Sequence, residues 1–163
     1  MRIYILLAVV SAAFLGACAS APPFDLKNVN TALTPNEAVA QIDSVRGSRV
    51  LWGGVIVSSK NLEQGTQLEM LAYPLNDHHR PRLDRAALGR FIVEHSGYLE
   101  TVDYAPGREL SLIGVIAGTK EARIDAASTL YPAVTSEQIH LWPKGSGESE
   151  PQFHFGVGVM FHN

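Results

Sequence analysis

The sequence predicts a small, mainly β domain in which antiparallel strands close into a barrel, with one short helix in front of them. From residue 50 onward, short segments rich in β-branched and aromatic residues alternate with turns that contain Gly, Pro or Asn. Helical periodicity is confined to residues 34–45, so the β-α-β alternation that is typical of a parallel sheet is missing. These two observations favour one mostly antiparallel barrel.

The chain begins with a segment that is typical of a secretory signal peptide. One basic residue, Arg2, is followed by apolar residues through Leu15. This run is shorter than the ~20 residues that a transmembrane helix needs. We therefore interpret residues 1–17 as a signal peptide, with cleavage between Ala17 and Cys18.

Cys18 is the only cysteine of the chain, so it cannot form an internal disulfide. Together with Leu15-Gly16-Ala17 it resembles the lipobox of bacterial lipoproteins. That resemblance implies a diacylglycerol on the Cys18 thiol, an acyl chain on the new amino terminus, and the lipoprotein maturation and sorting machinery as partners. No other cofactor is expected.

The lipobox resemblance also implies a destination. Lipoproteins retained in the inner membrane commonly carry Asp directly after the lipidated cysteine, where this chain has Ala19. We therefore expect a lipid anchor in the outer membrane, with the domain facing the periplasm. An ordinary signal peptide is the alternative, because small residues flank the site. Such a site does not require a cysteine, which favours lipidation.

Residues 18–33 are polar and contain two prolines, which predicts a tether. Thr34-Pro35-Asn36-Glu37 is typical of a capping box, with Pro at the first helical position. Apolar residues then recur every three positions until Gly47, which predicts a helix over 34–45 that covers one end of the barrel. Residues 34–163 are expected to form a single domain.

The strand pattern favours an oligonucleotide/oligosaccharide-binding (OB) type of barrel. The pair Gly53-Gly54 indicates a bend of the kind that turns a barrel corner. Pro132 indicates that the extended segment around it lies at a sheet edge. A transmembrane barrel would need at least eight strands, more than the chain shows. The strands are expected at residues 50–57, 66–73, 90–95, 109–117, 130–134, 139–142 and 153–161.

Seven segments within residues 45–143 resemble, in unbroken order, the Slp family of starvation-inducible outer-membrane lipoproteins. The resemblance implies a globular periplasmic domain with an envelope or stress-associated role and no established enzymatic chemistry. Residues 121–127 depart from the family pattern, which has a glycine and an aromatic residue around the isoleucine. The segments are Val50–Ile56, Leu68–Leu75, Arg80-Pro81, Gly89-Arg90-Phe91, Ser96–Leu99, Tyr104–Arg108 and His140–Pro143.

The charge balance disfavours a nucleic-acid partner. The chain has 13 basic and 16 acidic residues, a formal net charge of −3. Removing the predicted signal peptide also removes Arg2, which makes the mature chain one unit more negative. Binding to a phosphate backbone depends on lysine and arginine side chains that neutralise the phosphates.

No catalytic or metal-binding residue is predicted, and we expect a protein that is not an enzyme. Asp77-His78-His79 is the most metal-like cluster, but adjacent loop histidines do not provide three converging ligands. His154 and His162 stand eight residues apart, ~26 Å in a strand, which is too far to share an ion. Ser146 lacks the spacing of a nucleophile elbow.

Six aromatic residues could line a ligand groove, although packing in the core is the expected role of most: Trp52, Tyr73, Tyr98, Tyr104, Tyr131 and Trp142. Four arginines could form a patch that contacts lipid headgroups or glycan: Arg80, Arg82, Arg85 and Arg90. The candidate ligand surface combines Trp52, Arg80, Arg90, Tyr104 and Trp142.

The leading hypothesis is an outer-membrane lipoprotein with a structural, interaction or stress-related role in the envelope and a possible protein or glycan partner. A periplasmic module that binds a glycan or small molecule is the alternative.

Overall fold

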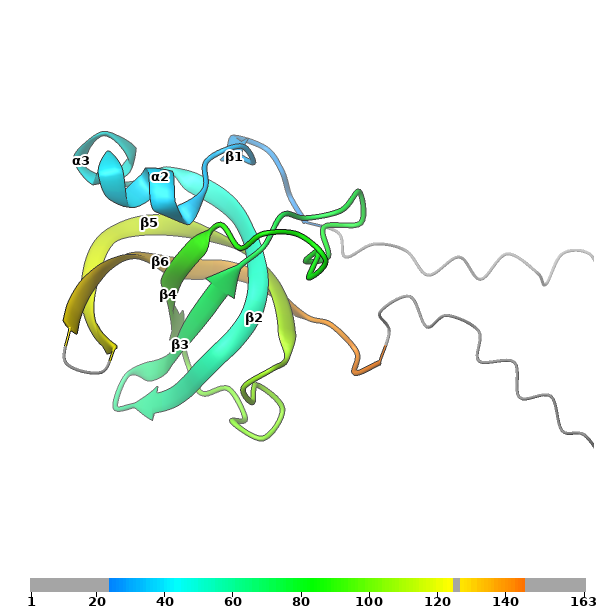
Figure 1. The fold of residues 1–163 in the computed structure, drawn as a ribbon. Coiled ribbons are helices and arrows are strands. Elements are labelled where there is room, and N and C mark those ends of the chain that lie inside the picture. Colours follow the sequence, from blue (N-terminus) through cyan, green and yellow to red (C-terminus); the bar gives the residue numbers. More distant parts are fainter. Residues whose placement is uncertain (1–23, 125–126, 146–163) are drawn as a thin grey trace, which may run out of the picture.

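The computed structural model describes residues 24–124 and 127–145. These residues form one closed sheet with two short helices beside it (Figure 1). The elements in chain order are β1 (Val29–Asn30), α2 (Pro35–Ala40), α3 (Ile42–Val45), β2 (Arg49–Leu62), β3 (Gly65–Ala72), β4 (Gly89–Ser96), β5 (Glu109–Ile124) and β6 (Ala127–Leu141).

Five strands close into a barrel in the order β2-β3-β4-β6-β5 and back to β2. All neighbours are antiparallel except β4 and β6, which pair in parallel over Ile92–Glu94 and Ala133–Thr135. This order confirms the predicted mainly β, OB-like barrel. Because the sheet closes on itself, the barrel proper has no unpaired edge.

The long strand β2 bends so that it serves two neighbours. Its first half pairs with β5 and its second half with β3, and the two pairings overlap at Gly54 and Val55. A Cβ atom at Gly54 would lie 1.9 Å from the backbone oxygen of Leu71, so only glycine fits at this bend. The predicted corner at Gly53-Gly54 is confirmed.

The core fills the interior of the barrel with side chains from all five strands. Trp52 is only 4% exposed and packs edge-on against Phe91, with 5.1 Å between ring centroids. Its indole N–H donates to the Leu33 carbonyl at 2.6 Å. Burying each large apolar side chain contributes about 1.5–3 kcal/mol. The other large, fully buried members include Ile56, Leu68, Met70, Val93, Leu110, Leu112, Ile116 and Val134.

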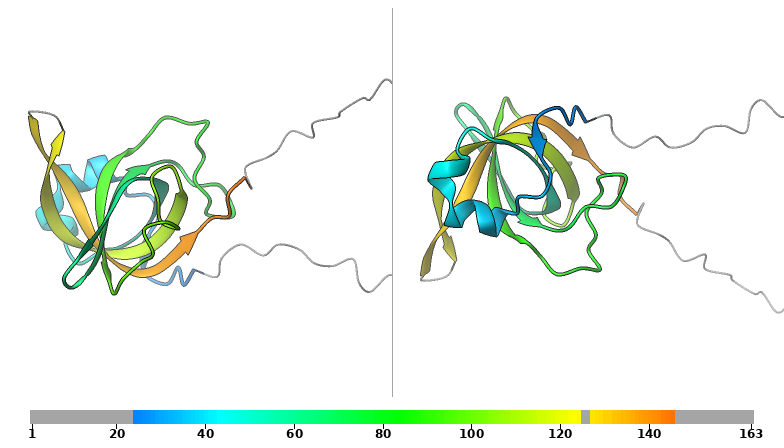
Figure 2. Two further views of the ribbon diagram at one scale, coloured as in Figure 1. Left: turned by 90° about the horizontal axis from the view of Figure 1, so that it is seen from below. Right: turned by 90° about the horizontal axis from the view of Figure 1, so that it is seen from above.

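The predicted start of the helix is confirmed, but the structure has two short helices where the sequence predicted one. The Thr34 hydroxyl accepts from the Glu37 amide, and the Glu37 carboxylate accepts from the Thr34 amide. Gln41, at φ −133° and ψ 32°, interrupts the helical backbone, so α2 and α3 are separate. Both helices lie over one end of the barrel (Figure 2).

The described part of the expected tether lies against the barrel. Val29 and Asn30 pair in parallel with Arg49 and Val50 of β2. The side chain of Leu33 is buried. Phe24, the first described residue, packs against the His79 ring with 5.9 Å between centroids.

The edge position expected for residues 130–134 is confirmed for Leu130–Pro132, whose strand partners lie in β5, and is wrong for Ala133 and Val134, which also pair with β4. They belong to β6, which pairs with β5 along its length and also contacts β4 from Ala133 onward. Pro132 immediately precedes the residues that pair with β4, so it leaves that parallel ladder intact. The short strand expected at 139–142 is the last part of β6, which ends at Leu141. The strand expected at 153–161 lies outside the described residues.

Candidate functional site

The structure does not bring the five residues of the candidate ligand surface together. Trp52 lies in the core, and Tyr104 is half-buried against the core, where burial raises the pKa of its hydroxyl. The guanidinium of Arg90 pairs with Glu69 on the outside of the barrel. Arg80 and Trp142 are in contact. The predicted surface therefore reduces to two residues that share one place.

Arg80 is held between a carboxylate and an aromatic ring. Its Nε and Nη2 donate to the two carboxylate oxygens of Glu109 at 2.7 and 3.0 Å. The two side chains are 14% and 19% exposed, and the guanidinium carbon lies 5.5 Å from the Trp142 ring centre. The hydrogen-bonded carboxylate raises the pKa of Arg80, so the guanidinium stays charged at neutral pH.

Ser111 links this pair to the neighbouring backbone. Its buried hydroxyl donates to the His79 carbonyl at 2.6 Å and accepts from the Trp142 indole N–H at 3.0 Å. The His140 ring packs edge-on against Trp142, and burial lowers the pKa of His140. We call Arg80, Glu109, Ser111, His140 and Trp142 the Arg80–Trp142 cluster. Its bonds fasten the loop over residues 74–88 to the barrel wall.

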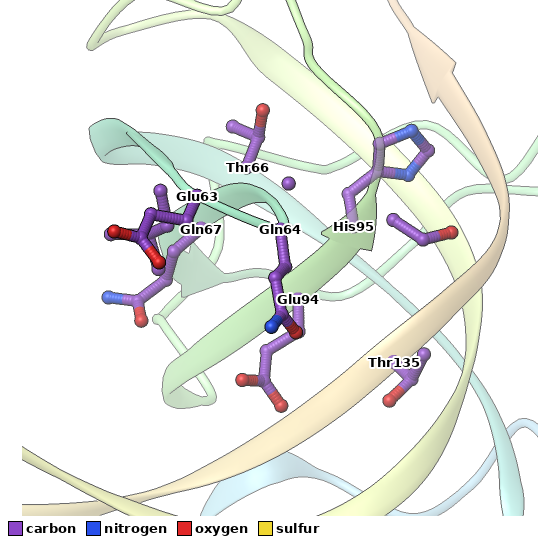
Figure 3. A pocket seen from close by; sticks show the side chains of 10 residues that line it. Glu63, Gln64, Thr66, Gln67, Glu94, His95 and Thr135 are labelled. Carbon is purple, nitrogen blue, oxygen red and sulfur yellow. The ribbon is translucent and has the colours of Figure 1, made fainter.

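The second feature is a cavity of about 540 Å³ beside the turn that joins β2 to β3 (Figure 3). We call it the β2–β3 cleft. Side chains of the turn, the end of β4 and the middle of β6 surround it. Its lining is Leu62, Glu63, Gln64, Gly65, Thr66, Gln67, Glu94, His95, Ser96 and Thr135.

Tyr98 is not one of the lining residues, but it bonds to one of them and is mostly exposed to solvent. The side chain is 68% exposed, yet its hydroxyl donates to the carbonyl of Glu63, a lining residue, at 3.1 Å. The Thr66 hydroxyl accepts from the Leu99 amide at 2.8 Å and so fixes the chain on the other side of Tyr98. The aromatic ring of Tyr98 is thus exposed to solvent, while hydrogen bonds of its hydroxyl and of the adjacent backbone restrain its position.

Two carboxylates and one ammonium group set the charge of the β2–β3 cleft. Glu63 and Glu94 are among its lining residues. Lys120, from β5, forms an ion pair with Glu94, and its Nζ lies 3.5 Å from the Gln67 side-chain oxygen. The lining therefore contains two carboxylates and no lysine or arginine, and one of the two carboxylates is paired with Lys120.

A serine and a histidine meet at the wall of the cleft. His95 Nδ1 lies 2.8 Å from the Ser136 hydroxyl, which also lies 3.5 Å from the Glu94 carbonyl. A nucleophilic serine needs a base that a third group orients. In the part of the chain that the structure describes, no carboxylate bonds to the His95 ring. The contact instead joins the end of β4 to β6, just beyond their short parallel ladder.

The sequence alone did not predict the lining residues of the cleft, and of its surroundings it indicated only Tyr98. Tyr98 was one of six aromatic candidates, and nothing in the sequence separated it from the five others. The polar lining residues Gln64, Gln67, Glu94 and Thr135 were missed, because a Gln or Glu on a strand or turn is typical of any solvated surface. The signal is spatial, since the lining comes from strands far apart in the chain.

Comparison with known proteins places the chain in a family. The family model described as "Outer membrane lipoprotein Slp family" matches residues 15–159. The chain belongs to the Slp family of outer membrane lipoproteins. The match includes Cys18, and it confirms the family resemblance that the sequence motifs indicated.

Three curated relatives are similar to this Slp-family chain. An uncharacterized protein of Haemophilus influenzae is 27% identical over 75% of this chain and 67% of its own length. "Outer membrane protein Slp" of Escherichia coli is 26% identical over 82% of this chain and 72% of its own. The E. coli "uncharacterized lipoprotein YeaY" is 28% identical over 56% and 49%.

Among solved structures, the mitochondrial single-stranded DNA binding protein Rim1 of S. cerevisiae is similar at a TM-score of 0.37 and 11% identity. The alignment covers 58% of this chain and 93% of Rim1.

Three of the segments that resemble the Slp family lie next to one another in the structure. Arg80, Arg108 and Trp142 come from these segments, and Arg108 donates to the Trp142 carbonyl at 3.0 Å. Much of the recognisable sequence pattern therefore builds the Arg80–Trp142 cluster and its surroundings. The Ser96–Leu99 segment connects the pattern to the β2–β3 cleft: Ser96 lines it, and Tyr98 and Leu99 bond to the lining residues Glu63 and Thr66.

The remaining sequence predictions concern metal binding and the membrane. Asp77 and His78 lie exposed on the loop, and no group of three His, Cys, Asp or Glu side chains is arranged to hold a metal ion within residues 24–124 and 127–145. No helix in those same ranges has the length and apolar character to cross a bilayer. Ala17 and Cys18, the predicted cleavage and lipidation sites, lie outside the described residues.

Proposed function

We propose that this chain is a binding module that lipids on Cys18 hold at the periplasmic face of the outer membrane, and that it performs no chemistry of its own. One observation carries the binding role: the closed barrel presents an open cleft, with both apolar surface and polar side chains in its lining, beside an exposed tyrosine that bonds to a lining residue.

The short distance in sequence between Cys18 and the barrel supports the anchoring role. Phe24, six residues after Cys18, already packs against the barrel loop. Six residues span about 20 Å at full extension. Three acyl chains, each contributing ~0.8 kcal/mol per buried methylene, would hold the protein firmly in a bilayer. The barrel would then stay next to the membrane surface.

Anchoring is tested by intact-mass analysis and membrane fractionation of the full chain. The mature protein is expected to begin at Cys18 and to carry three acyl chains. Cys18→Ala should yield a protein without lipid that leaves the outer-membrane fraction. A Cys18→Ala protein that carries no lipid but remains firmly in the outer membrane would refute the anchor.

Ala19→Asp serves as the matched control. It keeps Cys18, so the lipid mass should be unchanged, whereas the residue after the cysteine now resembles that of lipoproteins retained in the inner membrane. We expect this variant to move to the inner-membrane fraction. An outer-membrane location with full lipidation would show that Ala19 does not direct the sorting.

A further inference from the structure

We infer that the β2–β3 cleft binds a neutral saccharide, with the exposed ring of Tyr98 stacking against one sugar face. The inference rests on the proposed binding role of the barrel and names the site and the class of ligand. Four independent features of the cleft support it: its aromatic neighbour, its hydrogen-bonding groups, its charge and its place in the barrel.

The aromatic neighbour supplies apolar contact at low conformational cost. Tyr98 is 68% exposed, and the bond from its hydroxyl to the Glu63 carbonyl restrains the ring before any ligand arrives. Leu62, 42% exposed, adds an apolar side chain to the same cleft. A sugar ring carries C–H groups on its faces, so it can cover an aromatic ring while its hydroxyls point outward. Binding sites commonly combine such apolar contact with a few polar groups that fix orientation.

The polar groups of the cleft are of the kind that hydroxyl groups pair with. Gln64, Gln67 and Thr135 carry amide or hydroxyl groups that both donate and accept, and Glu94 adds acceptor oxygens. Sugar hydroxyls are likewise donors and acceptors. Side chains from the turn, from β4 and from β6 therefore offer complementary partners around one cavity of about 540 Å³.

The charge of the cleft selects against anionic ligands. Glu63 and Glu94 are both lining carboxylates, and the nearby cation, Lys120, already pairs with Glu94. A nucleic acid or a sulfated glycan needs several cations to neutralise its charges. No lysine or arginine is among the lining residues of this cleft, whereas two glutamates are, so an uncharged saccharide fits it better than a polyanion does.

The position of the cleft agrees with the ligand face of this type of barrel. OB-type barrels bind oligonucleotides and oligosaccharides over their second and third strands, between the loop after the first strand and the loop after the fourth. Here β3 and β4 are the second and third barrel strands, and the β2–β3 turn is the first loop. The β5–β6 hairpin reaches the same face through Lys120, which contacts Gln67 and Glu94.

The inference is tested by titrating the full-length lipidated protein in lipid nanodiscs with two neutral probes, an N-acetylglucosamine tetramer and maltotetraose. We expect saturable binding of at least one, measured by calorimetry. Tyr98→Ala should weaken that binding about tenfold, because the sugar loses its apolar contact with the ring; tenfold corresponds to about 1.4 kcal/mol. Tyr98→Phe keeps the ring and should stay within about threefold of the unmodified protein.

Two controls show whether the cleft itself is responsible for the binding. Leu83→Ala removes another exposed apolar residue, one that does not line the cleft, and it should leave the affinity unchanged. The Cys18→Ala protein should bind the saccharide as well as the lipidated form does, so a failure of anchoring and a failure of the cleft give different results.

Three results would overturn the inference. The first is that neither neutral tetramer binds at millimolar concentration. The second is that a single-stranded oligothymidylate binds as tightly as the saccharide. The third is that Tyr98→Ala binds the saccharide with unchanged affinity.

Discussion

Two regions of this barrel use polar and aromatic side chains in opposite ways. In the Arg80–Trp142 cluster, the guanidinium, the carboxylate, the hydroxyl and the indole N–H bond to one another or to backbone, and the central ion pair is mostly covered. In the β2–β3 cleft, the side chains surround an open cavity beside an exposed ring. The first region holds the fold together, and the second is left available to a ligand.

The contrast shows that the most recognisable residues of a sequence need not be the ones that bind. Arg80 and Trp142 appeared as a ligand surface because arginine and tryptophan are enriched at binding sites. Glu109, the partner of Arg80, and Ser111, the partner of Trp142, lie 29 and 31 positions away along the chain. Because of these bonds, Arg80 and Trp142 stabilise the fold. Five predictions test this difference, four of them on stability.

The largest loss of stability is expected from Arg80→Ala. The substitution leaves Glu109 mostly covered without its partner, and breaking a buried pair costs about 3–5 kcal/mol. Because both side chains keep some exposure, we expect about 2–3 kcal/mol less free energy of unfolding in a urea titration. Arg85→Ala is the matched control: that arginine is 57% exposed, and its loss should cost under about 0.5 kcal/mol. Equal losses of stability in the two variants would contradict a stabilising role of the Arg80–Glu109 pair.

Ser111→Ala should cost less, about 1–2 kcal/mol. The hydroxyl is buried, and its loss leaves the His79 carbonyl and the Trp142 indole N–H without their partner. Thermal unfolding followed by circular dichroism measures the change. Ser58→Ala is the control, because its hydroxyl lies in an exposed setting 3.5 Å from Glu69. A Ser111→Ala protein as stable as Ser58→Ala would show that the hydroxyl is not a required link.

Acidification should weaken the cluster through His140, by less than either truncation. Burial lowers the pKa of this imidazole in the folded state below the ordinary value of 6.5. The unfolded chain therefore binds a proton first, and the stability that neutral His140 contributes is lost as the pH falls below about 6.5. His140→Gln should flatten this part of the stability profile between pH 7 and 5. A profile that is identical in both proteins would exclude His140 as a source of the slope.

Only a small effect on stability is expected at Tyr98. Its ring is mostly in solvent, so Tyr98→Ala should change the free energy of unfolding by no more than about 0.5 kcal/mol. Chemical denaturation measures this directly. A loss as large as that of Ser111→Ala would mean that Tyr98 serves the fold, which would remove the main support for a ligand role.

Gln64→Ala tests whether a polar residue of the cleft affects binding without affecting stability, as is expected of Tyr98. The side chain extends from the β2–β3 turn and lines the cavity. We expect unchanged stability and a weakening of saccharide binding of about threefold, the value of a single neutral hydrogen bond. Stronger binding by Gln64→Ala would contradict the hydrogen-bonding role of this residue.

Local sequence signals predicted the parts of the fold that local physics decides. The capping box at Thr34 and Glu37 is a contact between residues three positions apart, so the sequence contains it entirely. The corner at Gly53-Gly54 was predictable because only glycine tolerates such close backbone approach. The strand segments followed from their β-branched and aromatic content.

Long-range pairing decided what the sequence did not predict. Residues 118–124 are mostly polar or small, yet β5 continues through them because β6 pairs with them residue by residue. Strand β6 gains its second neighbour, β4, only from Ala133, directly after Pro132. The cleft was missed for the same reason, since it exists only where the turn, β4 and β6 meet.

One paired measurement tests the central claim, that the β2–β3 cleft binds and the Arg80–Trp142 cluster holds the fold. Saccharide affinity and free energy of unfolding are measured on Tyr98→Ala and Arg80→Ala at a temperature where both are folded. Tyr98→Ala is expected to lose affinity and keep stability, whereas Arg80→Ala is expected to lose stability and keep affinity. Loss of affinity in Arg80→Ala with unchanged binding in Tyr98→Ala would contradict the account.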